Sequence, residues 1–211
     1  MSRCVILSAC PVQPELKRLL RSDDFIIACD AGYRNCERLG CKPDIIVGDV
    51  DSAPRPQQDK DDIVVLPHVK DDTDTEYAAK LAAQKGFDEV LLLGALGGKR
   101  VEHTLANLCT GLGLEQRGVR AALQDERSRI TFVLPGESRC YPKEEFFYFS
   151  AFPMEGRAEG VYEKGSFYEL EDAVLTAGYP LGVSNEYAEG SDCITVSTRQ
   201  GALVVVETIA D

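Results

Sequence analysis

The sequence predicts an α/β domain with a mostly parallel, Rossmann-like sheet, followed by a smaller antiparallel β-sandwich domain. Up to about residue 125, short apolar runs alternate with helix-like segments, which is the pattern of a parallel sheet covered by helices. Beyond that point, short strand-like runs are separated by turns that contain glycine, and no helical period is convincing, as is typical of a sandwich. We therefore expect two domains, 1–125 and 126–211.

The elements of the first domain follow from apolar runs and helix signals. Strands are expected at 3–9, 25–29, 45–47, 63–66, 89–93 and 119–123, and helices at 14–21, 33–39, 73–86 and 103–116. Thr73 and Glu76 fit the capping-box pattern at the start of the third helix. In the last helix, Leu105, Leu108, Cys109 and Leu112 are expected to face inward.

The second domain is expected to contain strands only. These are the runs at 130–134, 145–152, 166–170, 194–197 and 203–207, and turn signals lie between them at 135–136, 163–165 and 199–201.

The composition excludes several classes of protein. The chain has 211 residues, with 23 basic against 35 acidic side chains and a net charge of −12, which argues against binding to nucleic acid or to an anionic membrane surface. Eight cysteines without a CxxC pattern, together with only two histidines, argue against a zinc site. We see no leader and no apolar run near 18 residues, so we expect a cytoplasmic protein with free thiols.

In the stretch 44–52, two carboxylates follow a short apolar run. The apolar run 45–47 ends at Gly48, and Asp49 and Asp51 follow. Ligands of a parallel sheet bind at the carboxyl ends of its strands, and paired carboxylates suit the hard cation Mg²⁺. A polar turn after a strand explains this stretch equally well, because Asp, Gly and Ser are common in turns.

Other strand ends bring further acids to the same edge of the predicted sheet. Asp30 follows the second strand, and Asp72 with Asp74 follows the fourth. So many like charges would destabilise the fold unless a cation neutralised them. The next strand end carries the run 97–100, Gly-Gly-Lys-Arg, which is suited to phosphates. We therefore expect a nucleoside triphosphate and a phosphoryl-type transfer, without a P-loop.

Several motifs in order resemble the thiamine pyrophosphokinase family. They are Asp30-Ala31-Gly32, the run from Gly48 to Ser52, the run from Lys70 to Ala78, the run from Gly94 to Gly98, and the run from Arg100 to Asn107. In the second domain, Ser184-Asn185 resembles the family's thiamine-contacting pair. The sequence departs from the family's usual Gly-Gly-Arg-x-Asp-His motif, because Lys99 is inserted and Glu102 stands in place of Asp.

The resemblance implies a reaction and an assembly. Thiamine and ATP would give thiamine diphosphate and AMP, by attack of the thiamine hydroxyl on the β-phosphorus. Residues 1–125 would bind ATP and Mg²⁺, and residues 126–211 would bind thiamine and form a homodimer, with thiamine bound between subunits. The chain has no Trp, so an aromatic contact to thiamine must come from Tyr or Phe, with Tyr179 and Tyr187 as candidates.

The expected roles divide into metal ligands and substrate contacts. Mg²⁺ is assigned to Asp49, Asp51 and Asp74, with Asp72 near the metal or the thiamine hydroxyl. These acids are the expected catalytic residues. The expected substrate contacts are Asp30, Lys70, Thr73, Gly97, Gly98, Arg100, His103, Asn107, Ser184 and Asn185.

Each substrate contact has a structural alternative. Thr73 can be a helix cap, His103 and Asn107 can make structural hydrogen bonds, and Arg100 can be a solvated charge. Ser184 and Asn185 can be an ordinary turn. Two other functions also fit: another Mg²⁺-dependent pyrophosphokinase or DxD-type transferase, and a non-catalytic nucleotide or thiamine sensor.

Overall fold

The structure is a computed structural model that describes residues 2–48, 63–65 and 72–210. The chain divides into two compact units, Met1–Glu126 and Arg127–Asp211. All eight cysteines are free thiols. Among the described residues, no helix is long and apolar enough to cross a membrane.

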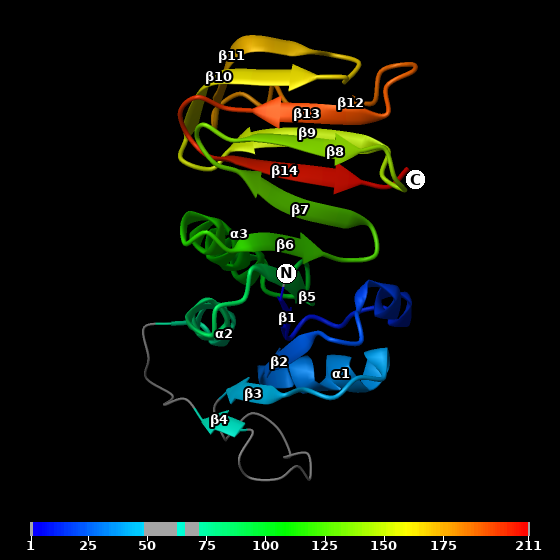
Figure 1. Cartoon of the computed structure of the whole chain (residues 1–211), viewed down its shortest axis with the longest axis vertical. Coiled ribbons are helices and arrows are strands. Elements are labelled where there is room, and N and C mark those ends of the chain that lie inside the picture. Colours follow the sequence, from blue (N-terminus) through cyan, green and yellow to red (C-terminus); the bar gives the residue numbers. More distant parts are fainter. Residues whose placement is uncertain (1, 49–62, 66–71, 211) are drawn as a thin grey trace. The chain divides into compact units, whose positions relative to one another are not determined.

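The first unit contains parallel strands in the order β6-β5-β1-β2-β3-β4 (Figure 1). They are β1 (Arg3–Leu7), β2 (Phe25–Cys29), β3 (Ile45–Gly48), β4 (Ile63–Val65), β5 (Glu89–Leu93) and β6 (Arg120–Gln124). Leu7 pairs in register with both Leu93 and Ala28, so β1, β5 and β2 end at one edge of the sheet. The strand order changes direction between β1 and β5, which is where ligands bind in open α/β sheets.

Helices cover both faces of this sheet. They are η1 (Pro14–Leu19), η2 (Asp30–Gly32), α1 (Tyr33–Leu39), α2 (Asp74–Gln84) and α3 (Val101–Gln116). Val5 and Leu7 pack with Cys36 and Leu39 of α1 in one buried cluster. Since side chains alternate along a strand, the equally buried Ile6 faces the opposite side, where α2 contacts β1, β2 and β3.

The second unit is built from antiparallel strands in two sheets. One has the order β12-β9-β14-β7 and the other has the order β11-β10-β13-β8. The strands are β7 (Ser128–Val133), β8 (Ser138–Pro142), β9 (Tyr148–Pro153), β10 (Arg157–Lys164), β11 (Leu170–Thr176), β12 (Asn185–Glu186), β13 (Cys193–Ser197) and β14 (Leu203–Thr208).

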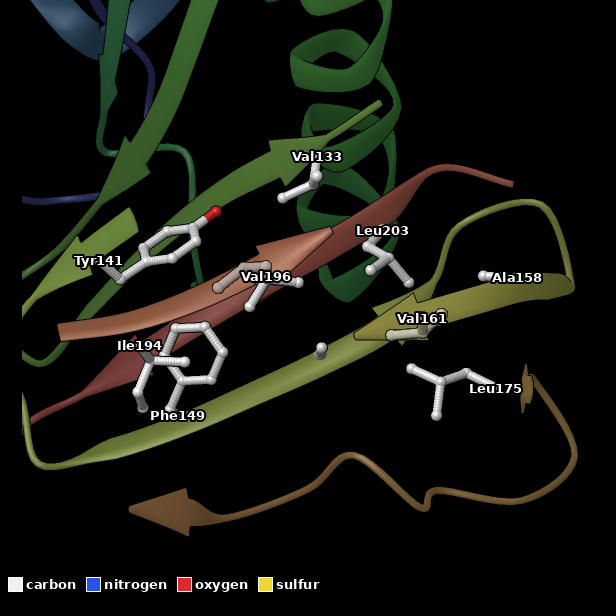
Figure 2. Packing of buried hydrophobic residues seen from close by; sticks show 11 residues of the cluster. Val133, Tyr141, Phe149, Ala158, Val161, Leu175, Ile194, Val196 and Leu203 are labelled. Atoms are coloured by element: carbon white, nitrogen blue, oxygen red, sulfur yellow. The ribbon is translucent and has the colours of Figure 1, made fainter. Parts of the chain in front are cut away.

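The two sheets of this unit share one hydrophobic core. Phe149 and Leu203 contribute from the first sheet, and Val161, Ile194 and Val196 contribute from the second. Figure 2 shows these side chains pointing toward one another between the strands. The predicted β-sandwich is therefore present.

Some sequence predictions of the fold are wrong. Taken over the chain, the strands are mixed, parallel in the first unit and antiparallel in the second, so "mostly parallel" describes only the first unit. The strand expected at 166–170 instead begins at Leu170, and the expected strands did not include β8 or β10. The helix expected at 14–21 is a 3-10 helix that ends earlier, at Leu19.

The helix α3 buries a different face from the predicted one. Leu105 is 59% exposed and Cys109 is exposed, whereas Asn107, Thr110 and Leu114 are buried. Small and polar residues pack against neighbouring elements here, so an inward face judged by hydrophobicity alone was misplaced.

Candidate active site

Asp30 lies where the ends of β2 and β3 meet. It follows β2 directly and has a left-handed backbone, with φ 47°, which is uncommon outside glycine. A Cβ atom built on Gly48, the last residue of β3, would lie 3.1 Å from Asp30 Oδ1. The glycine therefore leaves room for this carboxylate at the carboxyl end of β3, immediately before Asp49 in the chain.

The start of α2 is fixed against the same edge. Thr73 caps the helix, because its Oγ1 accepts the Glu76 N–H at 3.1 Å, so the predicted cap is confirmed. The hydroxyls of Ser8 and Thr75 are hydrogen-bonded at 2.9 Å in the interior, just beyond the end of β1. The Cys29 thiol, at the end of β2, donates to the Asp74 carbonyl oxygen at 3.5 Å. These contacts hold Asp74 at the carboxyl edge of the sheet.

Asp72 has a partner that the sequence did not suggest. Its Oδ1 lies 2.6 Å from Nζ of Lys80, in the middle of α2, and both side chains are partly exposed. The ammonium offsets part of the negative charge at this edge. Nothing in the local sequence pattern signals a pair eight residues apart, since side chains on one helix meet at spacings of three or four.

The glycine loop after β5 is held from inside. The buried Asn107 donates from Nδ2 to the Ala95 carbonyl oxygen at 2.8 Å. Thr104 Oγ1 accepts the Gly97 N–H at 3.0 Å, and the Cys10 thiol donates to the Gly97 carbonyl oxygen at 3.2 Å. Gly97 and Gly98 have φ values of 72° and 83°, which favour glycine. Asn107 thus makes the structural contact named as its alternative, and Thr104 of α3 is a contact to the loop that sequence reasoning missed.

The start of α3 is exposed and carries an ion pair. Arg100 precedes the helix, and its Nε donates to Glu102 Oε1 at 2.7 Å. This hydrogen bond is the main cause of the lowered pKa of Glu102. His103 is exposed, and its backbone N–H bonds to the Arg100 carbonyl oxygen. Glu102 therefore pairs with its neighbour.

A cavity of about 210 Å³ lies beside the glycine loop. Its lining comes from the ends of β1, β5 and β6 and includes Cys10, Gly94, Gly97, Gly98 and Asp125. This is the edge at which the strand order changes direction, so the cavity lies where α/β sheets hold their ligands.

The second unit presents Ser184 beside a buried amide. Ser184 is exposed, has φ 57°, and donates its N–H to Ser150 Oγ at 3.0 Å. Asn185 is 6% exposed. Its Nδ2 donates to Glu163 Oε1 at 2.5 Å and to the Tyr168 carbonyl oxygen at 2.8 Å. Its Oδ1 accepts two backbone N–H groups, those of Tyr168 and Glu186, each at 3.0 Å.

Two exposed aromatic side chains stand next to this pair. Phe167 and Tyr168 are 66% and 70% exposed, and their rings meet edge to face at 4.9 Å. Of the tyrosines singled out in the sequence, Tyr187 is engaged internally, with its hydroxyl donating to the Pro142 carbonyl oxygen. Tyr179 is exposed and lines a separate cavity of about 250 Å³. Because the chain has no Trp, the sequence limited an aromatic contact to Tyr or Phe, but it did not single out Tyr168.

Three predicted residues fall outside the described part of the chain: Asp49, Asp51 and Lys70. Within residues 2–48, 63–65 and 72–210, no three His, Cys, Asp or Glu side chains form a group suited to a metal ion. The structure therefore places Asp30 just after β2 and Asp74 at the start of α2, in contact with the end of β2, while Asp72 lies two residues before that helix.

Two family models match the chain, one in each unit. The model described as thiamin pyrophosphokinase, catalytic domain, matches residues 16–123. The model described as thiamin pyrophosphokinase, vitamin B1 binding domain, matches residues 139–203. A curated thiamine pyrophosphokinase from Bacillus subtilis (strain 168) is 27% identical over 139 residues, which are 66% of this chain and 64% of that relative, just under two thirds of its length.

Solved structures share the fold. A thiamine pyrophosphokinase from Bacillus subtilis matches with a TM-score of 0.88 at 24% identity, covering 100% of both chains. A thiamin pyrophosphokinase from Geobacillus thermodenitrificans matches with a TM-score of 0.85 at 26% identity, covering 100% of this chain and 98% of that one.

Proposed function

Because the chain belongs to the thiamin pyrophosphokinase family, we propose that it transfers the diphosphoryl group of ATP to the hydroxyl of thiamine. The thiamine oxygen forms a bond to the β-phosphorus, and the bond from that phosphorus to the oxygen bridging the α-phosphate breaks. AMP leaves, and the hydroxyl proton passes to a carboxylate, for which Asp72 is our candidate. The observation that carries the proposal is the match of both family models, in order, along one chain.

A divalent metal suits the acids at the sheet edge, and we propose Mg²⁺. Asp30 follows β2 beside the end of β3, and Asp74 begins α2 in contact with Cys29 at the end of β2. Carboxylate oxygens are the ligands that hard cations prefer. Asp49, Asp51 and Asp74 would bind the ion directly, and Asp30 would lie next to these ligands without binding the ion itself. When bound, the ion would neutralise negative charge on the phosphates. Catalysis of this kind depends on positioning and charge stabilisation rather than on covalent chemistry by the protein.

We propose that ATP occupies the edge between β1 and β5. The cavity beside Gly97 and Gly98 supports this, since it lies at the change of strand direction. Arg100 is exposed at the start of α3, where a guanidinium can turn from Glu102 to a phosphate at little cost, because exposed ion pairs are weak. Lys70 remains a proposed phosphate contact.

We propose that thiamine binds at the Ser184 segment of the second unit. Ser184 offers an exposed hydroxyl, and the Phe167–Tyr168 pair offers an aromatic surface for the rings of thiamine. Asn185 has both amide atoms engaged within the protein, so we assign it to holding this segment as well as to bordering the acceptor. A homodimer is part of the same proposal.

The choice of acceptor can be tested directly. Purified protein with ATP and Mg²⁺ is supplied with thiamine, with a pterin alcohol, or with no acceptor, and AMP is measured. We expect AMP only with thiamine. AMP formed with the pterin alcohol alone would favour the other pyrophosphokinase, and no AMP with either acceptor would favour a non-catalytic sensor.

A further inference from the structure

A buried carboxyl group lies in the interior of the second unit. Glu163 is on β10 and is 0% exposed. In the sheet it stands opposite Val196 of β13 and Leu170 of β11, so its neighbours in register are apolar. Burial raises the pKa of Glu163 to about 7, although the nearby polar side chains of Ser166 and Asn185 lower it. A carboxyl group buried in such a place lowers the stability of the fold unless its oxygens are fully hydrogen-bonded, so its presence here suggests a functional reason.

One oxygen of this carboxyl group has a specific partner. Oε1 accepts the hydrogen bond from Asn185 Nδ2, and Oε2 is buried with no hydrogen-bond partner among the described residues. None of the ion pairs found in the described part of the chain includes Glu163. The group therefore acts toward its surroundings mainly through Asn185.

The Asn185 amide connects Glu163 to two backbone segments, at Tyr168 and at Glu186. Its Oδ1 faces two N–H donors, and its Nδ2 faces two acceptors, one of which is Glu163. Turning the amide over would set N–H against N–H, so Glu163 helps to fix which way it points. Through that orientation the amide holds both backbone groups of Tyr168.

We propose that Glu163 is a positioning residue for the acceptor site, which holds Ser184 and Tyr168 in place by anchoring the Asn185 amide. The inference rests on the proposed thiamine-binding role of that segment. Ser184 has a left-handed backbone, which is costly for a residue with a Cβ. Its N–H is bonded to Ser150, and the residue that follows it in the chain, Asn185, is the one that Glu163 anchors. Loss of the anchor would let this segment relax.

Variants of Glu163 separate positioning from general stability. Glu163→Ala removes the acceptor for Asn185, and we expect the thiamine KM to rise about tenfold with the ATP KM unchanged. Glu163→Gln keeps an oxygen at Oε1, so its thiamine KM is expected within about twofold of the original protein. Glu159→Ala removes an ion-paired, partly exposed carboxylate on the same strand and serves as the matched control.

Amide hydrogen exchange gives a second measurement that does not depend on activity. The N–H groups of Tyr168 and Glu186 should exchange faster in Glu163→Ala and at the original rate in Glu163→Gln. If Glu163→Ala does not fold, Glu163→Leu fills the volume without an acceptor and takes its place. Unchanged exchange at both amides would overturn the inference, and so would an equal rise of both KM values. A protein that makes no AMP, yet shows the expected exchange, would refute the proposed function alone.

Discussion

At the scale of single residues, the carboxylates at the strand ends carry the account. Asp74 begins α2, and its carbonyl oxygen receives the Cys29 thiol, so its position depends on contacts far apart in the chain. Thr73, by contrast, caps its helix through a hydrogen bond to a residue only three positions away in the sequence. The first arrangement needs the fold, and the second can be predicted from a short motif.

Replacing Asp74 with Asn tests its proposed role as a ligand. We expect turnover at saturating Mg²⁺ to fall by about two orders of magnitude or more, because the ion would lose a charged oxygen ligand. Stability without metal should hold or rise, since a like charge is removed. Asp23→Asn, an exposed change in the turn before β2, is the control. Turnover close to that of the original protein for Asp74→Asn would exclude it as a ligand.

Tyr168 gives a second residue-scale prediction. Tyr168→Ala removes an exposed ring from a residue whose backbone is bonded to the Asn185 amide. We expect the thiamine KM to rise about 5- to 30-fold, the effect of losing an aromatic contact to a cation of about 1–2 kcal/mol. The ATP KM should not change. Tyr179→Ala, at an equally exposed ring on the separate cavity, is the matched control. If Tyr179→Ala alone raises the thiamine KM, the acceptor lies at that cavity instead.

At the scale of elements, local signals were read correctly and long-range ones were not. The parallel strands β1, β2, β3 and β5 are continuous apolar runs, so their sites followed from hydrophobicity. The inward face of α3 could not be predicted from hydrophobicity, because the polar Asn107 is buried and bonded to the Ala95 carbonyl oxygen while Leu105 is exposed. Likewise, Asn185 is hydrogen-bonded to Glu163, which is 22 residues away in the sequence, and no local sequence pattern predicts that these residues are in contact.

The glycine loop after β5 should depend on Asn107. Asn107→Ala leaves the Ala95 carbonyl oxygen without its partner, which costs about 1–3 kcal/mol of unfolding free energy. We expect the ATP KM to rise and the thiamine KM to stay unchanged, because the loop borders the proposed nucleotide cavity. Denaturant titration and initial rates measure the two effects. A rise in the thiamine KM alone would show that the loop serves the acceptor.

The buried Glu163 on β10 predicts a pH-dependent stability. Its pKa is about 7 in the fold against 4.5 for the ordinary group, so between these values the folded state holds more protons than the unfolded chain. Unfolding free energy should therefore fall as pH rises from about 4.5 to 7 and then level off. Glu163→Gln does not titrate, so its stability relative to the original protein should improve by up to about 3 kcal/mol between pH 5 and pH 8. Urea titrations that give the same difference at both pH values would contradict this.

At the scale of the whole molecule, two units of different architecture serve two proposed substrates. The catalytic-domain model falls in the parallel unit and the vitamin B1-binding model falls in the sandwich. The order of motifs from Asp30 to Asn107 was enough to suggest the family, because the order and spacing of motifs can be read from the sequence without knowing which residues are in contact. The acceptor site was harder to predict, since only Ser184-Asn185 resembled the family pattern.

The proposed homodimer is a whole-molecule prediction. We expect light scattering under assay conditions to give a mass of twice the 23.1 kDa chain. Leu181 and Val183, which precede Ser184 in the second unit, are exposed apolar side chains that a second copy would remove from water. An active species with the mass of one chain would reject a site shared between subunits.

The central claim is that a diphosphoryl group moves as one unit from ATP to thiamine. Its most direct test uses ATP labelled in the β-phosphate, with Mg²⁺ and thiamine, and follows the label through product separation. We expect the label to appear in thiamine diphosphate, one AMP to form for each molecule of thiamine diphosphate, and both products to require the metal. Formation of ADP together with thiamine monophosphate, with the label retained in ADP, would show transfer of the γ-phosphoryl group and contradict the account.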